Sequence, residues 1–375
     1  MSGVYIHIPF CKQACHYCDF HFSTSLKLKS NLVEAILTET DLRLPYLKNK
    51  NIETIYFGGG TPSLLSEKEL FLILEKLYKT YNVSSHAEIT LEANPDDLSI
   101  DKLKELKRLE INRLSIGLQS FNDEELIWMN RAHTAAESEA SVKRSQDKGF
   151  ENISIDLIYG SKFSNLTNWK KTLDKTISLD VKHISSYNLT IEDKTKLGHD
   201  FKVKKEMAID DEKSSELFLE MIDRLEKNKF IHYEISNFGK ENWFSNHNSN
   251  YWKGIDYIGF GPSAHSFDGV SRQWNISNNS LYIKNVNDTN ESYFEKELLS
   301  EVDQFNEYIL TSLRTIWGID AEVLKNKFSS EIIHSFNRNI NTYISKGMVT
   351  FTNNQYVLTI KGKLFADRIA SELFV

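Results

Sequence analysis

All three cysteines of the chain, Cys11, Cys15 and Cys18, lie within eight consecutive residues, separated by three and then two positions. A disulfide would leave one thiol over, and the chain shows no secretory signal that would send it to an oxidising compartment. A structural zinc would need a fourth ligand, but no nearby histidine or aspartate stands at a usual zinc-finger spacing. Thiolates suit an iron–sulfur cluster, in which three cysteines leave one iron open to another ligand. The spacing therefore favours an open cluster over zinc or inert thiols.

Other polar and glycine residues follow predicted strands. The sequence GGGTP at residues 58–62 is neither a Walker loop nor a dinucleotide motif, and alone it indicates only a tight turn that could let backbone approach a ligand. Glu92, Gln119 and Asp156 end or follow strands, and Arg131 lies in MNRAH. Each alone is more often a surface group or half of an ion pair. Because parallel strands carry their sites at their carboxyl ends, together they predict one site.

These residues need a scaffold, and the first 227 residues alternate strand-like and helical patterns. Strands are expected at residues 4–8, 52–57, 87–92, 113–118, 153–157 and 183–188. Helices are expected at residues 30–44, 66–77, 100–109, 123–129, 137–148, 168–178 and 210–227. Six strand–helix units predict a parallel sheet with right-handed crossovers, either an open barrel or a doubly wound sheet.

The pattern changes after residue 229. A strand is expected at residues 230–235, followed by an ordered loop rich in Asn, Gly and aromatic residues. Residues 275–290 are the best candidate for a linker or an insertion. Helices near residues 305–315, 322–328 and 331–346, a hairpin turning at Asn353-Asn354 and a last helix predict a winged-helix-like domain. We therefore expect a core of residues 1–229, a flanking region of residues 230–299 and a C-terminal domain of residues 300–375.

Composition narrows the possible partners. The chain has 375 residues, 40% hydrophobic and 26% charged, and no apolar run near the roughly 18 residues of a membrane-spanning helix. A net charge of −7 and a pI near 5.9 argue against nucleic acid as the main partner. The predicted C-terminal domain balances eight basic against eight acidic residues, which favours a structural or docking role. We expect a cytoplasmic protein without a transmembrane segment, for which peripheral membrane contact stays open.

The motif Cys11-x3-Cys15-x2-Cys18, with an aromatic residue before the last cysteine, resembles the signature of the radical S-adenosylmethionine (SAM) superfamily. The resemblance implies an α/β fold, an open partial (β/α)6 TIM-like barrel with a C-terminal winged-helix-like helical domain. It also implies a [4Fe-4S] cluster on the three cysteines, whose open iron is chelated by SAM before SAM is cleaved to a 5′-deoxyadenosyl radical. By the same resemblance, the SAM contacts are Tyr5, Tyr17, Gly59, Gly60, Thr61, Glu92, Gln119, Arg131 and Asp156.

The segments YIHIPFC, FGGGTPSLL, LEANP, RLSIGLQSFND, DLIYG, YEISNF and HNSNYW together resemble the coproporphyrinogen-dehydrogenase-like group of this superfamily. Oxygen-independent coproporphyrinogen III dehydrogenases carry a fourth cysteine where this chain has Phe20, and a longer segment before the first strand. Both departures resemble instead the HemW family of heme chaperones, which bind heme and deliver it to acceptor proteins. In that family the histidine of HNxxYW, here His247, is linked to heme, and Tyr251 and Trp252 could cover a porphyrin face. The alternative is a histidine hydrogen-bonded within an Asn-rich loop.

Overall fold

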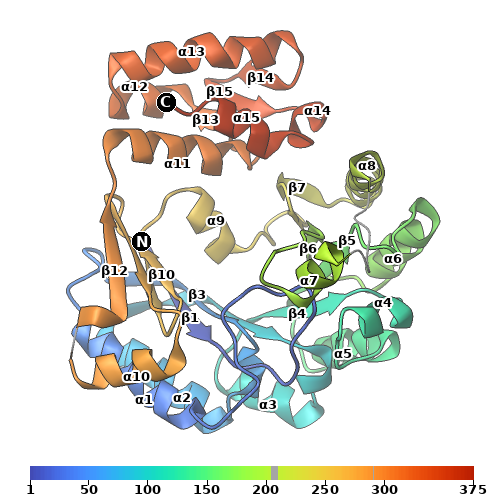
Figure 1. The fold of residues 1–375 in the computed structure, drawn as a ribbon. Helices are drawn as coiled ribbons and strands as arrows, with labels where there is room; N and C mark the ends of the chain where they lie inside the picture. Colours follow the sequence, from blue (N-terminus) through green and yellow to red (C-terminus); the bar gives the residue numbers. More distant parts are fainter. Residues whose placement is uncertain (204–209, 290) are drawn as a thin grey trace.

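Six parallel strands form the centre of the sheet in the computed structural model, which describes residues 1–203, 210–289 and 291–375 (Figure 1). They pair in chain order: β1 (Ser2–Ile8), β2 (Asn51–Gly59), β3 (Asn82–Ala93), β4 (Arg113–Gln119), β5 (Asn152–Tyr159) and β6 (His183–Asn188). The strand order never reverses, as it would in a doubly wound sheet. The observed sheet is therefore the predicted open barrel, and all six strands are confirmed.

Helices connect these strands and cover the outside of the barrel (Figure 1). They are α1 (Lys29–Leu42), α2 (Glu67–Thr80), α3 (Ile100–Arg108), α4 (Asp123–Trp128), α5 (Ala135–Asp147), α6 (Leu166–Ser178), α7 (Lys196–Lys202) and α8 (Asp211–Lys227), with short 3-10 turns η1 (Pro62–Leu64) and η2 (Pro95–Asp97). A capping box begins α2, since the Ser66 side chain accepts from the Glu69 amide and the Glu69 side chain accepts from the Ser66 amide. Helix α7 was not predicted.

Further strands extend both edges of the sheet: β7 (Ile231–Glu234), β8 (Asn237–Gly239), β9 (Tyr257–Phe260), β10 (His265–Phe267), β11 (Ser271–Asn275) and β12 (Phe294–Leu298). Strand β8 pairs antiparallel with β6, and β7 lies outside it. On the other side, β9 pairs parallel with β1, and β10 to β12 continue antiparallel. The twelve-stranded sheet thus ends in two separate edges, so the barrel stays open.

The prediction of an ordered loop after residue 235 is wrong. The HNSNYW segment forms helix α9 (Asn246–Trp252), which lies between the sheet and the C-terminal helices (Figure 1). The Ser245 hydroxyl caps it by accepting from the Asn248 amide at 3.3 Å. The Glu88 carboxylate, from β3, accepts from the amides of Asn246 and His247 at 3.1 and 3.0 Å. Partners distant in the sequence therefore stabilise a helix that its own composition does not favour.

The predicted linker at residues 275–290 is also wrong. Residues there form helix α10 (Asn279–Asn287), capped by the Asn278 side chain, which accepts from the Leu281 amide at 3.0 Å. Tyr282 and Val286 are fully buried in the main hydrophobic core, so this segment is part of the barrel. Only Asn290 of that stretch lies outside the described residues.

The C-terminal residues form a second hydrophobic cluster, separate from that of the barrel. Its elements are α11 (Glu301–Leu313), β13 (Ile319–Asp320), α12 (Ala321–Lys327), α13 (Ser330–Ser345), β14 (Val349–Thr352), β15 (Gln355–Leu358), α14 (Ile360–Lys363) and α15 (Ala366–Glu372). The hairpin is confirmed, and Asn353 and Asn354 both have positive φ, as its tight turn requires. The division at residues 229 and 299 stays a prediction.

Candidate functional site

The cysteine loop follows the carboxyl end of β1, and hydrogen bonds fix it to the segment after α4 and at its own base. Its His16 amide donates to the Met129 carbonyl at 3.1 Å, and the Asn130 side chain, in the turn after α4, donates to the Ala14 carbonyl at 2.7 Å. The Cys11 amide donates to the Ser23 carbonyl at 3.0 Å, which closes the loop at its base. These contacts place the loop across the mouth of the barrel.

The three thiols are free and half-buried, and they line one cavity. The Arg131 guanidinium lies 3.4 Å from the Cys15 sulfur, and the Thr61 hydroxyl lies 3.5 Å from the Cys11 sulfur. Burial raises the pKa of the Cys11 thiol, and it raises that of Cys18 to about 12. Without a metal the site therefore favours protonated thiols, and a bound metal would have to displace those protons.

This first cavity has a volume of about 440 Å³ and opens at the carboxyl ends of the parallel strands. All of the residues predicted for the cluster and SAM sites except Tyr5 line it: Cys11, Cys15, Tyr17, Cys18, Gly59, Gly60, Thr61, Glu92, Gln119, Arg131 and Asp156. They come from the cysteine loop, from the carboxyl-terminal parts of β2, β3, β4 and β5, and, for Arg131, from the turn after α4. The sheet thus brings together residues that are up to 145 positions apart in the chain, between Cys11 and Asp156.

Two carboxyl groups dominate the electrostatics of the first cavity. The Glu92 carboxylate accepts from the Tyr56 hydroxyl at 2.8 Å and from the Gly59 amide at 3.2 Å. Burial, together with the nearby charge of Asp156, raises the pKa of Glu92 to about 7. Burial also raises the pKa of Asp156 to about 6, against the opposite effect of the Arg113 charge. A cationic ligand group would stabilise both carboxylates in their charged form.

Backbone of the glycine turn at residues 58–60 lines part of the same cavity. Gly59 has a φ of +105°, a conformation that favours glycine. A Cβ at Gly60 would lie 2.8 Å from backbone atoms of Ile8 and Phe10, at the start of the cysteine loop. Position 60 therefore accepts no side chain unless the cysteine loop moves.

Several lining residues were missed by the sequence reasoning, namely Asn94, Ser115, Gly117, Tyr187 and Asn188. Asn94 links two other site residues by hydrogen bonds, because its side chain accepts from Arg131 at 2.6 Å and donates to the Thr61 hydroxyl at 3.2 Å. It stands inside the LEANP segment, two residues after Glu92. Its position at the end of a predicted strand could have identified Asn94 as a site residue.

Tyr5 and His247 lie outside the first cavity. Tyr5 lines a second cavity, and its hydroxyl lies 3.3 Å from Nδ1 of His7. His247 is buried, with Nδ1 2.8 Å from the Thr54 hydroxyl and Nε2 2.8 Å from the Tyr251 hydroxyl. Both ring nitrogens are therefore engaged, and His247 orients Tyr251, which does line the second cavity. These two contacts are of the kind that the hydrogen-bonded alternative describes, and a role of His247 in heme binding stays a prediction.

The second cavity, of about 740 Å³, lies between the β1–β9–β10 part of the sheet, helix α9 and helices α11 and α12. Phe20, the residue that stands in place of a fourth cysteine, lines both cavities and is 67% exposed. The two cavities therefore meet at a single aromatic side chain, two residues after Cys18. Arg272, on β11 beside this cavity, forms an ion pair with Glu307.

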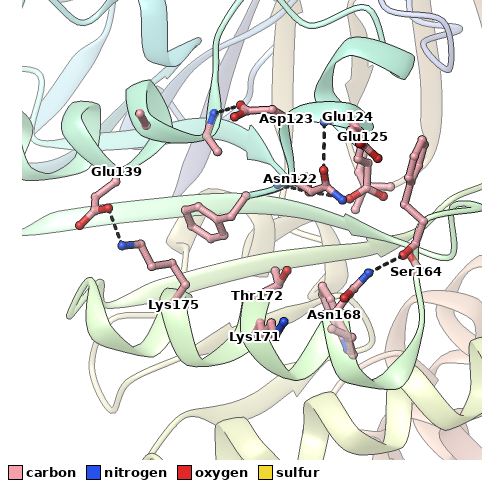
Figure 2. Close-up of a pocket in the computed structure, with 17 residues that line it drawn as sticks. Asn122, Asp123, Glu124, Glu125, Glu139, Ser164, Asn168, Lys171, Thr172 and Lys175 are labelled. Carbon is pink, nitrogen blue, oxygen red and sulfur yellow. Dashed lines mark hydrogen bonds and ion pairs between the residues drawn. The ribbon is translucent and has the colours of Figure 1, made fainter.

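A further cavity, of about 780 Å³, lies on the outer side of the barrel between α4, α5 and α6 (Figure 2). Some of its charged groups bond to one another or to nearby backbone: Lys175 pairs with Glu139, and Asp123 accepts from the Ala135 amide at 2.7 Å. None of the residues predicted for the site lines it, so we assign it no chemistry.

The first cavity fits the cluster and cofactor that the cysteine motif implies. Among the described residues, no three His, Cys, Asp or Glu side chains converge as a single metal ion requires. A four-iron cluster needs no such convergence, because each cysteine binds a different iron. The buried carboxyls suit the positive charges of SAM, and the tight glycine wall suits close backbone contact with its amino-acid end.

Fold and site together define a radical SAM protein, and the comparisons with known proteins agree. Residues 5–176 match the model of the radical SAM superfamily, and residues 299–365 match that of the HemN C-terminal domain. The structure of Escherichia coli coproporphyrinogen III oxidase (HemN), a radical SAM enzyme, superposes with a TM-score of 0.85 over 100% of this chain and 90% of that one, at 21% identity. This likeness shows the fold.

Sequence relatives identify the family. The heme chaperone HemW of Bacillus subtilis is 32% identical over 98% of both chains. The HemW of Lactococcus lactis is 31% identical over 96% of this chain and 94% of the relative's length. The HemW of E. coli is 35% identical over 70% of this chain and 69% of the relative's length. The chain belongs to the HemW family. No helix among the described residues is long and apolar enough to cross a membrane, and the cytoplasmic location stays a prediction.

Proposed function

We propose that this protein binds heme and delivers it to acceptor proteins, and that it carries a [4Fe-4S] cluster and SAM. The observation that carries the proposal is the near full-length relationship to proteins named heme chaperones. The second cavity supports it, since it offers space for a large flat ligand that the first cavity lacks.

In this proposal Cys11, Cys15 and Cys18 hold the cluster, which when bound supplies the electron that cleaves SAM. Arg131 holds the loop that carries the thiols and keeps positive charge beside Cys15. The remaining lining residues bind SAM: Tyr17, Gly59, Gly60, Thr61, Glu92, Gln119 and Asp156. Glu92 and Asp156 would bind cationic or hydroxyl groups, because both are buried acceptors facing the cavity.

The alternative is an oxygen-independent coproporphyrinogen III dehydrogenase, which shares the fold. Phe20 argues against it, because a phenyl ring cannot replace the fourth cysteine of that branch. An exposed aromatic ring between the two cavities instead provides an apolar contact for a ligand in the second cavity.

The test combines two assays on one anaerobically reconstituted preparation. We expect hemin to bind saturably, with a new absorption band, and we expect no conversion of coproporphyrinogen III with SAM and reductant. A Phe20→Cys variant controls for the missing fourth cysteine, and it should not gain decarboxylation. Turnover by the wild type without hemin binding would overturn the proposal in favour of the dehydrogenase.

A further inference from the structure

Arg113, the first residue of β4, is a buried charge inside the barrel. Along this strand, Leu114 and Ile116 belong to the hydrophobic core, whereas Ser115 and Gly117 line the first cavity. Because successive side chains of a strand alternate between its two faces, Arg113 shares the face of Ser115 and Gly117. It stands at the amino end of β4 and is 1% exposed, so its side chain lies deeper in the barrel than the cavity does.

The guanidinium of Arg113 has no fixed protein partner. Its Nε and Nη1 atoms are buried and donate no hydrogen bond to any residue that the structure describes. The hydroxyl of Thr90, which pairs with Arg113 between β3 and β4, is also buried without a partner among those residues. Burying a charge that is not hydrogen-bonded costs free energy of folding. Arg113 therefore does not stabilise the fold as half of an ion pair, which points to a role in the site above it.

Three carboxyl groups face the barrel interior from the strands that flank β4. Glu88 and Glu92 lie on the same face of β3, and Asp156 lies on β5. Glu88 is already engaged, since its two oxygens accept from the first two amides of α9. Glu92 and Asp156 line the first cavity instead. These two carboxyl groups therefore lie between Arg113 and a ligand of that cavity.

The other titratable groups around this interior region are uncharged at neutral pH. Burial lowers the pKa of His183 on β6, and it lowers that of His247 on α9 to about 3, so both imidazoles stay neutral. Burial also raises the pKa values of the surrounding phenols, which therefore stay protonated. These phenols are Tyr5, Tyr56, Tyr187, Tyr233 and Tyr251.

The charge of Arg113 acts on both carboxyl groups of the first cavity at once. It opposes the effect of burial on Asp156, whose pKa is raised to about 6, and on Glu92, whose pKa is raised to about 7. Arg131 at the cavity has a smaller effect of the same sign on Asp156. A bidentate ion pair would occupy the oxygens of one carboxylate. An unpaired guanidinium favours the charged form of both and leaves lone pairs of their oxygens available to a ligand.

We propose that Arg113 is a positioning residue for SAM, which acts through Glu92 and Asp156 and touches neither the ligand nor the cluster. Its buried positive charge keeps these two carboxylates ionised, and so ready to bind the positively charged end of SAM. The inference rests on the SAM binding proposed above, and it adds a residue that lines neither the first nor the second cavity.

Equilibrium binding of SAM to the anaerobically reconstituted protein, measured at pH 7 and at about pH 8.5, tests this role. In Arg113→Met, loss of the nearby positive charge should raise the pKa of each carboxyl group by about 1 or more. A rise of about 1 makes the doubly ionised form about tenfold rarer at pH 7 and less than about twofold rarer at pH 8.5. SAM affinity should fall by these factors relative to the wild type at the same pH.

Three further variants separate charge from structure. Arg113→Gln also removes the charge but keeps a polar side chain, so it should behave like Arg113→Met. Arg113→Lys keeps the charge, and because no bidentate pair is lost it should bind SAM within about twofold of the wild type at pH 7. Arg338→Met removes an exposed arginine on α13, in the C-terminal domain, and is the matched control that should leave SAM affinity unchanged.

The pH dependence decides the outcome. An equal loss of affinity at both pH values in a folded Arg113→Gln or Arg113→Met variant would overturn the charge-based role, and so would wild-type affinity at pH 7. Far-ultraviolet circular dichroism at each pH shows which variants are folded. Absence of SAM binding by the wild type would overturn the proposed SAM site as well, while hemin binding by the same preparation would leave the heme part of the proposed function standing.

Discussion

Replacing His247 by alanine should destabilise the protein. The ring is fully enclosed, with one nitrogen bonded to Thr54 and the other to Tyr251. It also stacks on Tyr56, with ring centroids 4.9 Å apart. The variant therefore removes a packed, doubly hydrogen-bonded group that links β2 to α9.

The size of the loss follows from these contacts. Thr54 is completely buried, so its hydroxyl would be left without a partner, at a cost of about 1–3 kcal/mol. The Tyr251 hydroxyl borders the cavity and can bond to water, so losing its partner costs about 1 kcal/mol. The stack on Tyr56 contributes about 1 kcal/mol more. We expect the free energy of unfolding to fall by about 4 kcal/mol.

Urea unfolding of the apoprotein, followed by far-ultraviolet circular dichroism, measures this change. Tyr251→Phe and the double variant complete a cycle, which should show a coupling of about 1 kcal/mol between the two side chains. His86→Ala should change stability by less than about 0.5 kcal/mol, because this side chain is exposed. Unchanged stability in His247→Ala would refute this reasoning.

The remaining predictions concern the first cavity. Alanine at Cys11, Cys15 or Cys18 should abolish iron binding and the SAM-dependent spectral change while far-ultraviolet circular dichroism stays that of the wild type; retained iron would contradict the cluster assignment. Gly60→Val should lower iron content as well as SAM binding, because the new side chain meets the backbone that leads into the cysteine loop; a loss of SAM binding alone would contradict this. SAM affinity should rise with pH up to about 7 and then level off, because Glu92 must lose its proton to hold a cation. The Glu92→Gln variant should lose this pH dependence. An unchanged pH profile in that variant would show that Glu92 is not the titrating group.

Much of the barrel could be predicted because strand patterns and strand direction are local properties of the sequence. The bounds of β6 match the predicted strand at residues 183–188, and the apolar runs of β4 and β5 were identified within two residues. Once the strands were known to be parallel, their carboxyl ends had to share one edge. For this reason Glu92, Gln119 and Asp156 could be assigned to one site without any knowledge of their distances.

The second cavity could not be predicted, because it depends on contacts between distant segments. Tyr5 lines the second cavity only because β9 pairs with β1, and no local sequence pattern predicts that pairing. Helix α9 forms in an Asn-rich segment because Glu88 of β3 accepts from its first amides.

A hemin titration of the anaerobically reconstituted wild-type protein, followed by absorption, tests the central claim most directly. The account predicts saturable binding of about one heme per chain, which persists when the cysteine cluster is absent, because the heme and cluster sites use different residues. Failure to bind hemin, in a preparation that holds its cluster and decarboxylates coproporphyrinogen III, would contradict it.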